Sequence, residues 1–457
     1  MGPGWAFSYR ELDGKVSAAE RRLERLGIAA GARVAVYLPK SADYTVMLLA
    51  LIRSGIVACP VSTRLPVGGV APLLGRAGCS SLISAYGGLA GEVDGIDVLD
   101  PEAVLAGDQG VEEDPGPIEV PLDRPSTVIF TSGSTGTPKA ALHTFGNHYL
   151  NAAGSNVNIP LAPGDRWLHS LPLYHVGGLS ILFRCLLAGA AVALPESAAP
   201  LAESIHGLRA THVSVVSTQL LRLLAEDADL SGLRTVLMGG GPIPPSLVDR
   251  ALARGVPVHT SYGLTEMASQ VTTTPPGASA GELRTAGRVL PHREMRISGA
   301  GEIQVKGATL FAGYLREGGP DLPLEDGGWF RTGDLGEMDA NGNLTVLGRR
   351  DNLFVSGGEN VRPEEIEAAL SRISGVEEAV VVPVPDPEFG ARPVAFVRRS
   401  AGAGDLARAL EPVLPRFKIP KTFHGWEGAG GMKPDRVALK ERASRLHRDN
   451  RRSRKDG

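Results

Sequence analysis

The sequence predicts an α/β protein with a large N-terminal domain, built of doubly wound mixed sheets plus a β subdomain, and a small mobile α+β C-terminal domain. Three observations carry this prediction. Short apolar strands alternate with amphipathic helices through the first half of the chain. Short segments of alternating polarity, typical of antiparallel strands, begin near residue 282. The chain has 457 residues, which is too long for one ordinary domain.

The first half of the chain is predicted to be a series of β-α units. Predicted helices cover residues 42–53, 66–77, 219–226 and 244–253. Predicted strands cover residues 33–38, 57–61, 81–84, 127–131, 190–194, 212–216, 235–238 and 256–260. Residues 100–125 are acidic and rich in proline and glycine, which predicts a connection at the surface.

The second half is predicted to change from antiparallel strands to a new α/β region. Asn341 and Gly342 form a strong hairpin signal. A helix with proline at its first position is predicted over residues 363–372. Predicted strands cover residues 294–298, 302–306, 335–338, 344–347, 376–384 and 393–398.

We place the domain boundary near Asp351, which gives domains of residues 1–350 and 351–457. The basic tail, residues 442–457, is low in apolar side chains and is expected to be a frayed, solvated end.

Composition excludes several classes of protein. Hydrophobic residues make up 43% and charged residues 21%, as in soluble globular proteins. The formal net charge of −3 favours neither nucleic acid nor an acidic membrane surface. Three cysteines without a C-x-x-C pair suggest neither a disulfide framework nor a zinc site, which fits a reducing cytoplasm. We find no secretory signal, and the longest apolar runs are too short to span a bilayer.

A glycine- and hydroxyl-rich loop follows the predicted strand 127–131. Glycines let backbone N–H groups approach an anion, and hydroxyls and a lysine add donors and positive charge, so the loop is predicted to cradle a polyphosphate. It is not a Walker A loop, because Pro138 replaces the second glycine and Ala140 follows the lysine. The alternative without a binding function is a flexible polar loop. The predicted phosphate-binding residues are Thr131, Ser132, Gly133, Ser134, Thr135, Gly136, Thr137 and Lys139.

This loop resembles the phosphate loop of the acyl-adenylate-forming superfamily, which includes acyl-CoA synthetases, luciferases and peptide-synthetase adenylation domains. Four further segments are similar to the family's motifs and come in the family's order. They are residues 261–266 (adenine and magnesium), 329–334 (ribose), 348–351 (hinge) and 356–361 (start of the small domain). The resemblance covers residues from about 33 to 440, nearly the whole chain.

The resemblance implies a nucleotide-binding role for residues of the large domain. Tyr262 would stack on adenine, edged by backbone groups near Gly240 and Gly241, with Gly263 beside it. Taken alone, Tyr262 would fit a half-buried aromatic residue at a strand end equally well. Taken alone, Asp334 would be better explained as a turn aspartate after Gly333. The resemblance further implies that Thr265 bonds the α-phosphate, Glu266 and Thr131 hold Mg²⁺, and Asp334 binds the ribose hydroxyls beside Arg349.

The second domain must supply positive charge, because a carboxylate that attacks the α-phosphorus brings two anions together. The family's catalytic lysine corresponds best to Lys433, although Met432 departs from the usual Gly-Lys spacing. Nearby lysines at 418, 421 and 440 are by default solvated. The resemblance also implies that Asp351 is the hinge and that Gly357 and Gly358 line the path of coenzyme A.

The segment 171–179 resembles the border of the family's acyl pocket, with His175 at the pocket mouth near the path of the incoming thiol. Arg184 lies in an apolar helical run, where a guanidinium requires an anion. An internal salt bridge or a snorkelling side chain would also explain it. In o-succinylbenzoate–CoA ligases, an arginine at this offset is associated with the dicarboxylate substrate. The implied substrate-binding residues are Arg184, His175, Gly177, Ser269 and Gln270.

The resemblance therefore implies an ATP- and Mg²⁺-dependent ligase that joins a carboxylic acid to coenzyme A, with 2-succinylbenzoate of menaquinone biosynthesis as the expected acid. Gly177 stands where some members carry a serine, so one possible hydroxyl contact to the acid is lost. Other aromatic or short-chain acids, a carrier-protein thiol as acceptor, and a nucleotide sensor without catalysis stay open as alternatives. Nucleic acid and membrane insertion are not expected, and a homodimer is left open.

Overall fold

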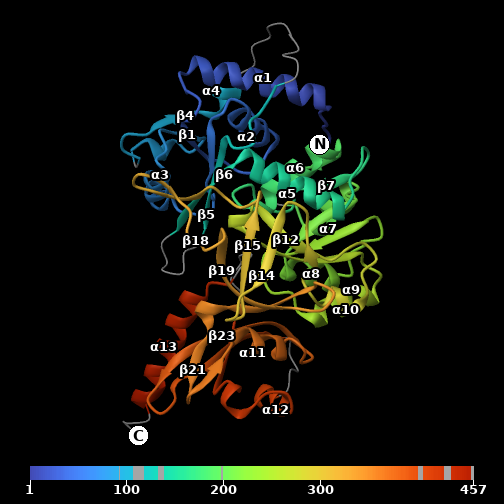
Figure 1. The fold of residues 1–457 in the computed structure, drawn as a ribbon, viewed down its shortest axis with the longest axis vertical. Coiled ribbons are helices and arrows are strands. Elements are labelled where there is room, and N and C mark those ends of the chain that lie inside the picture. Colours follow the sequence, from blue (N-terminus) through green and yellow to red (C-terminus); the bar gives the residue numbers. More distant parts are fainter. Residues whose placement is uncertain are drawn as a thin grey trace.

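The computed structural model describes residues 1–91, 93–105, 118–131, 138–196, 199–399, 405–426 and 434–453. Figure 1 shows a large upper part, coloured mainly blue to yellow with some orange segments, and a smaller orange-to-red part below it that holds the C-terminal end. The predicted mixed α/β architecture with a small C-terminal domain is confirmed. Asp351 lies in a single 3-10 turn, Arg350–Asn352, between the two parts, and the domain boundary there stays a prediction.

The first sheet has the strand order β17-β16-β6-β5-β2-β1-β3-β4. The strands from β5 to β4 along this order run parallel, whereas β6, β16 and β17 add antiparallel neighbours. The bounds are β1 Arg33–Tyr37, β2 Val57–Pro60, β3 Ser81–Ser84, β4 Asp97–Leu99, β5 Pro125–Thr131, β6 Lys139–Thr144, β16 Gly313–Arg316 and β17 Gly319–Asp321.

The second sheet has the order β13-β12-β11-β10-β9-β7-β8. Its strands are parallel from β11 to β8, and β12 and β13 are antiparallel additions. The bounds are β7 Arg166–Leu168, β8 Ala191–Ala193, β9 His212–Val215, β10 Thr235–Met238, β11 Val258–Leu264, β12 Ser269–Thr273 and β13 Arg288–Val289.

An antiparallel sheet follows, as the alternating pattern predicted. It is made of β14 Arg293–Ile297, β15 Glu302–Gly307, β18 Leu324–Glu325, β19 Trp329–Met338 and β20 Leu344–Arg349. Gly342, with φ of +79°, closes the turn between β19 and β20, a conformation that glycine adopts without the cost of a Cβ clash.

Helices α5 and α6 lie between the first two sheets. Helix α5, Phe145–Asn158, contacts β5 and β6 on one side and β12 on the other, and α6, Val176–Ala188, contacts α5, β8 and β12. The remaining helices of the large part are α1 Tyr9–Arg25, α2 Ala42–Arg53, α3 Ala71–Ala77, α4 Pro101–Leu105, α7 Leu201–Gly207, α8 Ser217–Ala225, α9 Pro245–Ala253 and α10 Ala280–Leu283.

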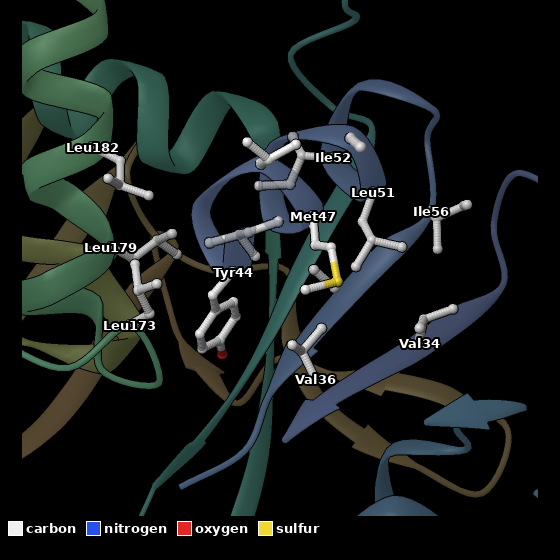
Figure 2. Packing of buried hydrophobic residues seen from close by; sticks show 14 of the residues in the cluster. Val34, Val36, Tyr44, Met47, Leu51, Ile52, Ile56, Leu173, Leu179 and Leu182 are labelled. Atoms are coloured by element: carbon white, nitrogen blue, oxygen red, sulfur yellow. The ribbon is translucent and has the colours of Figure 1, made fainter. Parts of the chain in front are cut away.

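Helix α2 shows how the sequence holds these layers together. Ser41 caps it by accepting a hydrogen bond from the Tyr44 amide, and its side chains are apolar almost all round. In Figure 2, Met47 and Leu51 point toward β1, while Tyr44 lies toward Leu173 and the α6 side chains. One helix thus joins the first sheet to α6, and burying apolar side chains on both sides stabilises the contact.

The C-terminal part contains the hairpin β21 Phe354–Ser356 with β22 Glu359–Val361, and a sheet of β23 Val376–Asp386, β24 Gly390–Arg399 and β25 Thr422–Gly425. Its helices are α11 Pro363–Leu370, α12 Leu406–Leu410 and α13 Arg436–Ser453. Helix α11 begins with proline as predicted, because its fixed φ suits the first turn.

Two predictions about helices were wrong. Residues 66–77 do not form one helix: a 3-10 turn, Val67–Gly69, precedes α3, because Pro72 is tolerated only in the first turn of a helix. The basic tail is not a frayed end over residues 442–453. Helix α13 runs to Ser453, and buried Leu439 and Ala443 pack with Phe396 and Trp426. Two apolar side chains one turn apart suffice to dock this otherwise charged helix.

Within the described ranges, none of the helices combines the length and apolar character needed to cross a bilayer.

Candidate active site

The phosphate loop joins two antiparallel strands. Thr131 at the end of β5 pairs with Lys139 at the start of β6, and residues 132–137 between them lie outside the described residues. The Arg76 guanidinium donates to the carbonyl of Pro138 at 2.9 Å. A Walker A loop leads from a strand into a helix. The strand-to-strand connection therefore agrees with the exclusion of that motif.

Lys139 and Glu266 both contact Tyr314, the first at its ring and the second at its hydroxyl. Strand β16 places Tyr314 beside Ala141 of β6. The Nζ of Lys139 lies 4.7 Å from the Tyr314 ring centroid, and the Tyr314 hydroxyl donates to Glu266 Oε1 at 2.5 Å. Burial, followed by the Glu266 charge, raises the pKa of Tyr314, so it stays a donor. Sequence reasoning missed Tyr314, because a tyrosine in a short strand carries no signal of what it faces.

Thr265 and Glu266 lie in a 3-10 turn, Thr265–Met267, directly after β11. The carbonyl of Thr265 accepts a hydrogen bond from His143 Nε2 at 2.7 Å, and the carbonyl of Glu266 accepts one from the Phe311 amide at 2.8 Å. Burial lowers the pKa of His143 to about 4, which keeps the ring neutral with its proton on Nε2. The turn that presents both side chains is therefore held by His143 of β6 and by Phe311 in the connection between β15 and β16.

Tyr262, Asp334 and Arg349 form one hydrogen-bonded group. The Tyr262 hydroxyl donates to Asp334 Oδ2 at 2.7 Å, and Arg349 Nη1 donates to Asp334 Oδ1 at 3.0 Å. Burial and then Asp334 raise the pKa of Tyr262 well above its ordinary value. The carboxylate of Asp334 is held at both oxygens, which gives it one defined orientation.

Gly240 and Gly241 follow β10, and Gly263 follows Tyr262 on β11. Gly240 has φ of +79° at the carboxyl end of β10, and the space beside Gly241 is open. Gly263 occupies a bulge between β11 and β12, where a Cβ would lie 2.3 Å from the carbonyl oxygen of Ser269. Only glycine fits there, so the close approach of the two strands depends on it.

Arg184 is buried, with 1% of its surface exposed. Its Nη2 donates to Gln270 Oε1 at 2.6 Å, and its guanidinium lies 5.1 Å from the Trp167 ring centroid. Among the residues that the structure describes, no carboxylate pairs with it, and its burial excludes snorkelling. Burial lowers its pKa to about 10, so it is charged at neutral pH. The described residues therefore disfavour both an internal salt bridge and a snorkelling side chain, and favour an anion from outside the chain as the partner of Arg184.

Gln270 and Ser269 lie beside Arg184 on β12. Gln270 Oε1 also accepts from Ser155 at 2.7 Å, and its Nε2 donates to Thr273 at 2.5 Å. Ser269 donates to the hydroxyl of Ser180 on α6 at 3.3 Å. Sequence reasoning missed a second buried arginine, Arg293, whose Nη1 donates to the backbone carbonyl of Gln270.

His175 is the N-cap residue of α6, and its ring meets the edge of the Tyr174 ring at 4.8 Å. Its side chain is exposed, yet the surrounding protein, followed by Arg64, lowers its pKa. Gly177 follows in the first turn, where a Cβ would lie 3.2 Å from Leu171 Cδ1. The nine residues from His175 to Arg184 span about 13 Å along the helix axis. His175 precedes the first turn of α6 and Arg184 lies about one turn before its end, so the two side chains are not in one contact.

Asp351, the predicted hinge residue, lies next to the hydrogen-bonded group of Tyr262, Asp334 and Arg349. Arg349 Nη2 lies 3.8 Å from Asp351 Oδ2, and Arg350 Nη1 donates to Glu302 at 3.2 Å. Buried Glu302 also accepts from Arg331 and from the amide of Gly333, the residue before Asp334. One carboxylate therefore connects β19, through Arg331 and Gly333, to Arg350, the residue directly before Asp351.

Gly357 and Gly358 form the tip of the hairpin β21–β22, with φ of +60° and +88°. A Cβ at Gly357 would lie 2.9 Å from the Phe389 ring, and its amide donates to the Phe389 carbonyl. Lys433 lies outside the described residues, just before Pro434. Lys418, one alternative, is committed to an ion pair with Glu365 at 2.6 Å.

Within the described part of the chain, no group of three or more His, Cys, Asp or Glu side chains is placed to hold a metal ion. Mg²⁺ that accompanies a nucleotide needs only one or two carboxylates, with phosphates and water as its other ligands. Glu266, a hard oxygen donor near Lys139, fits such an ion.

Comparison with known proteins agrees with this geometry. A model described as "AMP-binding enzyme" matches residues 2–315, and one described as "AMP-binding enzyme C-terminal domain" matches residues 365–427. A 2-succinylbenzoate–CoA ligase of Oceanobacillus iheyensis is 33% identical over 443 residues, which cover 92% of this chain and 90% of that protein.

Two solved structures of o-succinylbenzoate coenzyme A synthetase from Bacillus subtilis are similar over almost the whole chain. The complex with the acyl-adenylate intermediate has a TM-score of 0.84 at 31% identity and covers 96% of this chain and 92% of that one. The complex with ATP and magnesium has a TM-score of 0.82 at 32% identity and covers 93% and 92%. The chain belongs to the AMP-binding enzyme family and carries its C-terminal domain.

Proposed function

We propose that this enzyme is an ATP-dependent acid–CoA ligase that converts 2-succinylbenzoate to 2-succinylbenzoyl-CoA, the step of menaquinone biosynthesis that the resemblance implies. One observation carries the choice of acid: Arg184 is a buried cation without a carboxylate partner in the described residues. A dicarboxylic acid offers one carboxylate for activation and a second that can meet this charge. The names of the similar ligases agree with this acid.

In the first step, a carboxylate oxygen of the acid attacks the α-phosphorus of ATP. The bond to pyrophosphate breaks, and an acyl-adenylate forms. Lys139 and Lys433 offset the charge that gathers during the attack, and Thr265 orients the α-phosphate. Asp334, held by Tyr262 and Arg349, binds the ribose hydroxyls. Glu266 and Thr131 would hold Mg²⁺, which would supply further charge neutralisation on the phosphates.

In the second step, the thiolate of coenzyme A attacks the acyl carbon, and the bond to the AMP oxygen breaks. The small domain rotates about Asp351 between the steps, withdraws Lys433 and brings Gly357 and Gly358 to the thiol path. His175 lies exposed at the start of α6, and its lowered pKa leaves the neutral imidazole able to take the thiol proton.

Substitution of Arg184 tests the choice of acid. Arg184→Leu should raise KM for 2-succinylbenzoate by about 10- to 100-fold, because a hydrogen bond to a charged group contributes about 1.5–3 kcal/mol. A monocarboxylic analogue that lacks the non-reacting carboxylate should be affected far less. The measurement is coenzyme A-dependent AMP release, with Arg184→Lys as the variant that keeps the charge. Equal losses for both acids would contradict the assignment.

The same assay decides the acceptor. Free coenzyme A should support AMP release, and carrier proteins bearing a phosphopantetheine thiol should not. Turnover with a carrier protein alone would replace the coenzyme A proposal with the carrier-loading alternative.

We also place the enzyme in the cytoplasm. Its three cysteines, Cys59, Cys79 and Cys185, are buried free thiols, which are typical of reducing compartments. Activity that separates with a periplasmic or extracellular fraction would contradict this placement.

A further inference from the structure

Arg293, the first residue of β14, is a second buried cation next to the acid pocket. It is 6% exposed, and its guanidinium donates only to uncharged backbone oxygens. Nε donates to Pro291 at 2.9 Å, Nη2 to Asn151 at 3.3 Å, and Nη1 to Gln270. In the described part of the chain, no carboxylate forms an ion pair with it. Its charge is therefore solvated by dipoles alone.

Helix α5 is shaped to admit this guanidinium. Gly154 lies on α5 one turn after Asn151, and a Cβ at Gly154 would lie 2.5 Å from Arg293 Nη2 and 2.7 Å from the Pro291 carbonyl oxygen. The carbonyl of Asn151 on the same helix accepts from the guanidinium. A glycine in the interior of a helix is destabilising relative to alanine. Gly154 therefore lowers the stability of α5 at the point where the helix makes room for the Arg293 guanidinium.

The two buried arginines share Gln270. Its side-chain Oε1 accepts from Arg184, and its backbone oxygen accepts from Arg293. Burial, followed by the charge of Arg184, lowers the pKa of Arg293 to about 9, so both groups are charged at neutral pH. Two like charges in a low-dielectric interior raise the free energy of the empty site. An anion that enters the pocket relieves this repulsion.

We infer that Arg293 is a specificity-determining positioning residue, which acts with Arg184 to select acids that carry a second carboxylate. Arg184 is the group that meets the non-reacting carboxylate. Arg293 lies behind Gln270, holds the strand that orients the Gln270 amide on Arg184, and adds a second positive charge. This inference rests on the proposed function, because it assumes that the acid pocket lies at Arg184.

The test separates the charge of Arg293 from its hydrogen-bonding shape. Arg293→Met removes the charge and keeps the length, whereas Arg293→Lys keeps the charge and loses the planar fork. Arg296→Met is the matched control, because Arg296 lies on the same strand but is exposed over the Trp329 ring. We would measure KM and kcat for 2-succinylbenzoate and for the monocarboxylic analogue, KM for ATP, and the thermal midpoint.

Arg293→Met should raise the ratio of KM for the dicarboxylic acid to KM for the monocarboxylic acid by about tenfold, because a charge is lost near the bound carboxylate. KM for ATP should change by less than about twofold, because the effect of a lost charge decreases with distance. Arg293→Lys should keep most of the selectivity even if it is less stable, and Arg296→Met should leave the ratio unchanged.

Equal effects of Arg293→Met on both acids would overturn the inference and leave Arg293 as a structural tie. If the Met variant does not fold, Arg293→Lys decides, because loss of selectivity with the charge retained also overturns it. A wild-type enzyme that prefers a different dicarboxylic acid would refute the proposed substrate, and the inference would then be tested with that acid. Preference of the wild-type enzyme for monocarboxylic acids would overturn both.

Discussion

At the scale of single residues, function depends on side chains whose partners come from distant parts of the chain. The motif at residues 261–266 identifies Glu266 from the sequence alone. The side chain that orients Glu266 is Tyr314, which lies 48 residues later in the chain. The Tyr314 hydroxyl donates to the carboxylate that we propose holds Mg²⁺, and its ring lies under Lys139. Lys139 and Glu266, which we propose bind the phosphates and Mg²⁺, are therefore connected by an aromatic residue that belongs to none of the motifs.

Removal of the Tyr314 hydroxyl should weaken nucleotide binding without unfolding the protein. We expect Tyr314→Phe to raise KM for ATP by about tenfold, because a hydrogen bond to a charged group contributes about 1.5 kcal/mol or more. KM for the acid should be unaffected. The check is steady-state kinetics at several Mg²⁺ concentrations, with Tyr149→Phe at an exposed tyrosine as control. An unchanged KM for ATP would remove Tyr314 from the site.

At the scale of elements, strand β15 links the ribose motif to the hinge through Glu302. This buried carboxylate accepts hydrogen bonds from Arg331, Arg350 and the Gly333 amide. Burial alone would raise the pKa of Glu302, but these hydrogen bonds and the arginine charges outweigh it and lower the pKa. A lowered pKa means that the ionised form contributes stability above the ordinary glutamate pKa, and that this contribution is lost as the pH falls.

Glu302→Gln should therefore destabilise the protein in a pH-dependent way. At pH 7 we expect a loss of about 1–3 kcal/mol in the free energy of unfolding, because buried donors lose a charged acceptor. The difference from wild type should shrink as the pH falls below about 4.5, where the unfolded carboxyl is protonated. Urea unfolding at pH 7 and pH 4 measures both values. A difference that grows toward low pH would contradict the ion-pair account.

At the scale of the whole molecule, two parts of unequal size meet at Asp351. Ser246 of α9 donates to the carbonyl of Ser371 after α11, and Asn352 donates to Glu364 of α11. Within the small part, Arg436 at the start of α13 binds Glu367 at 2.7 Å and so anchors the end of the segment that carries Lys433. The proposed rotation of the small part about Asp351 would carry α13 with the sheet to which it is bound.

Lys433→Ala tests whether Lys433 acts in adenylate formation and not in thioester formation. We expect it to abolish adenylate formation, measured as pyrophosphate exchange, because the charge that offsets the attack is lost. Reaction of coenzyme A with a pre-made adenylate should be spared, because Lys433 is withdrawn in that step. Lys440→Ala, on the same helix-bearing segment, is the control. Equal loss of both half-reactions would contradict the proposed role.

Local patterns in the sequence were enough for most elements of the fold. The strand over residues 81–84 and the helix over residues 42–53 match the structure, because their periodicity, caps and flanking turn residues act over a few positions. The helix α13 was missed, since its docking depends on Phe396 and Trp426, which are remote in sequence. The phosphate loop could be assigned only by its composition, and residues 132–137 lie outside the described part of the chain.

By itself, the sequence determined the fold class, the order of the motifs and the residue types available for adenylate chemistry, because these are local properties of the chain. Only the tertiary structure decided that Arg184 has no carboxylate partner among the described residues, and that Arg293 lies behind the same glutamine. The physical reason is that the cost of burying a charge depends on every group around it. Those groups come from α5, α6, β12 and β14, which only folding brings together.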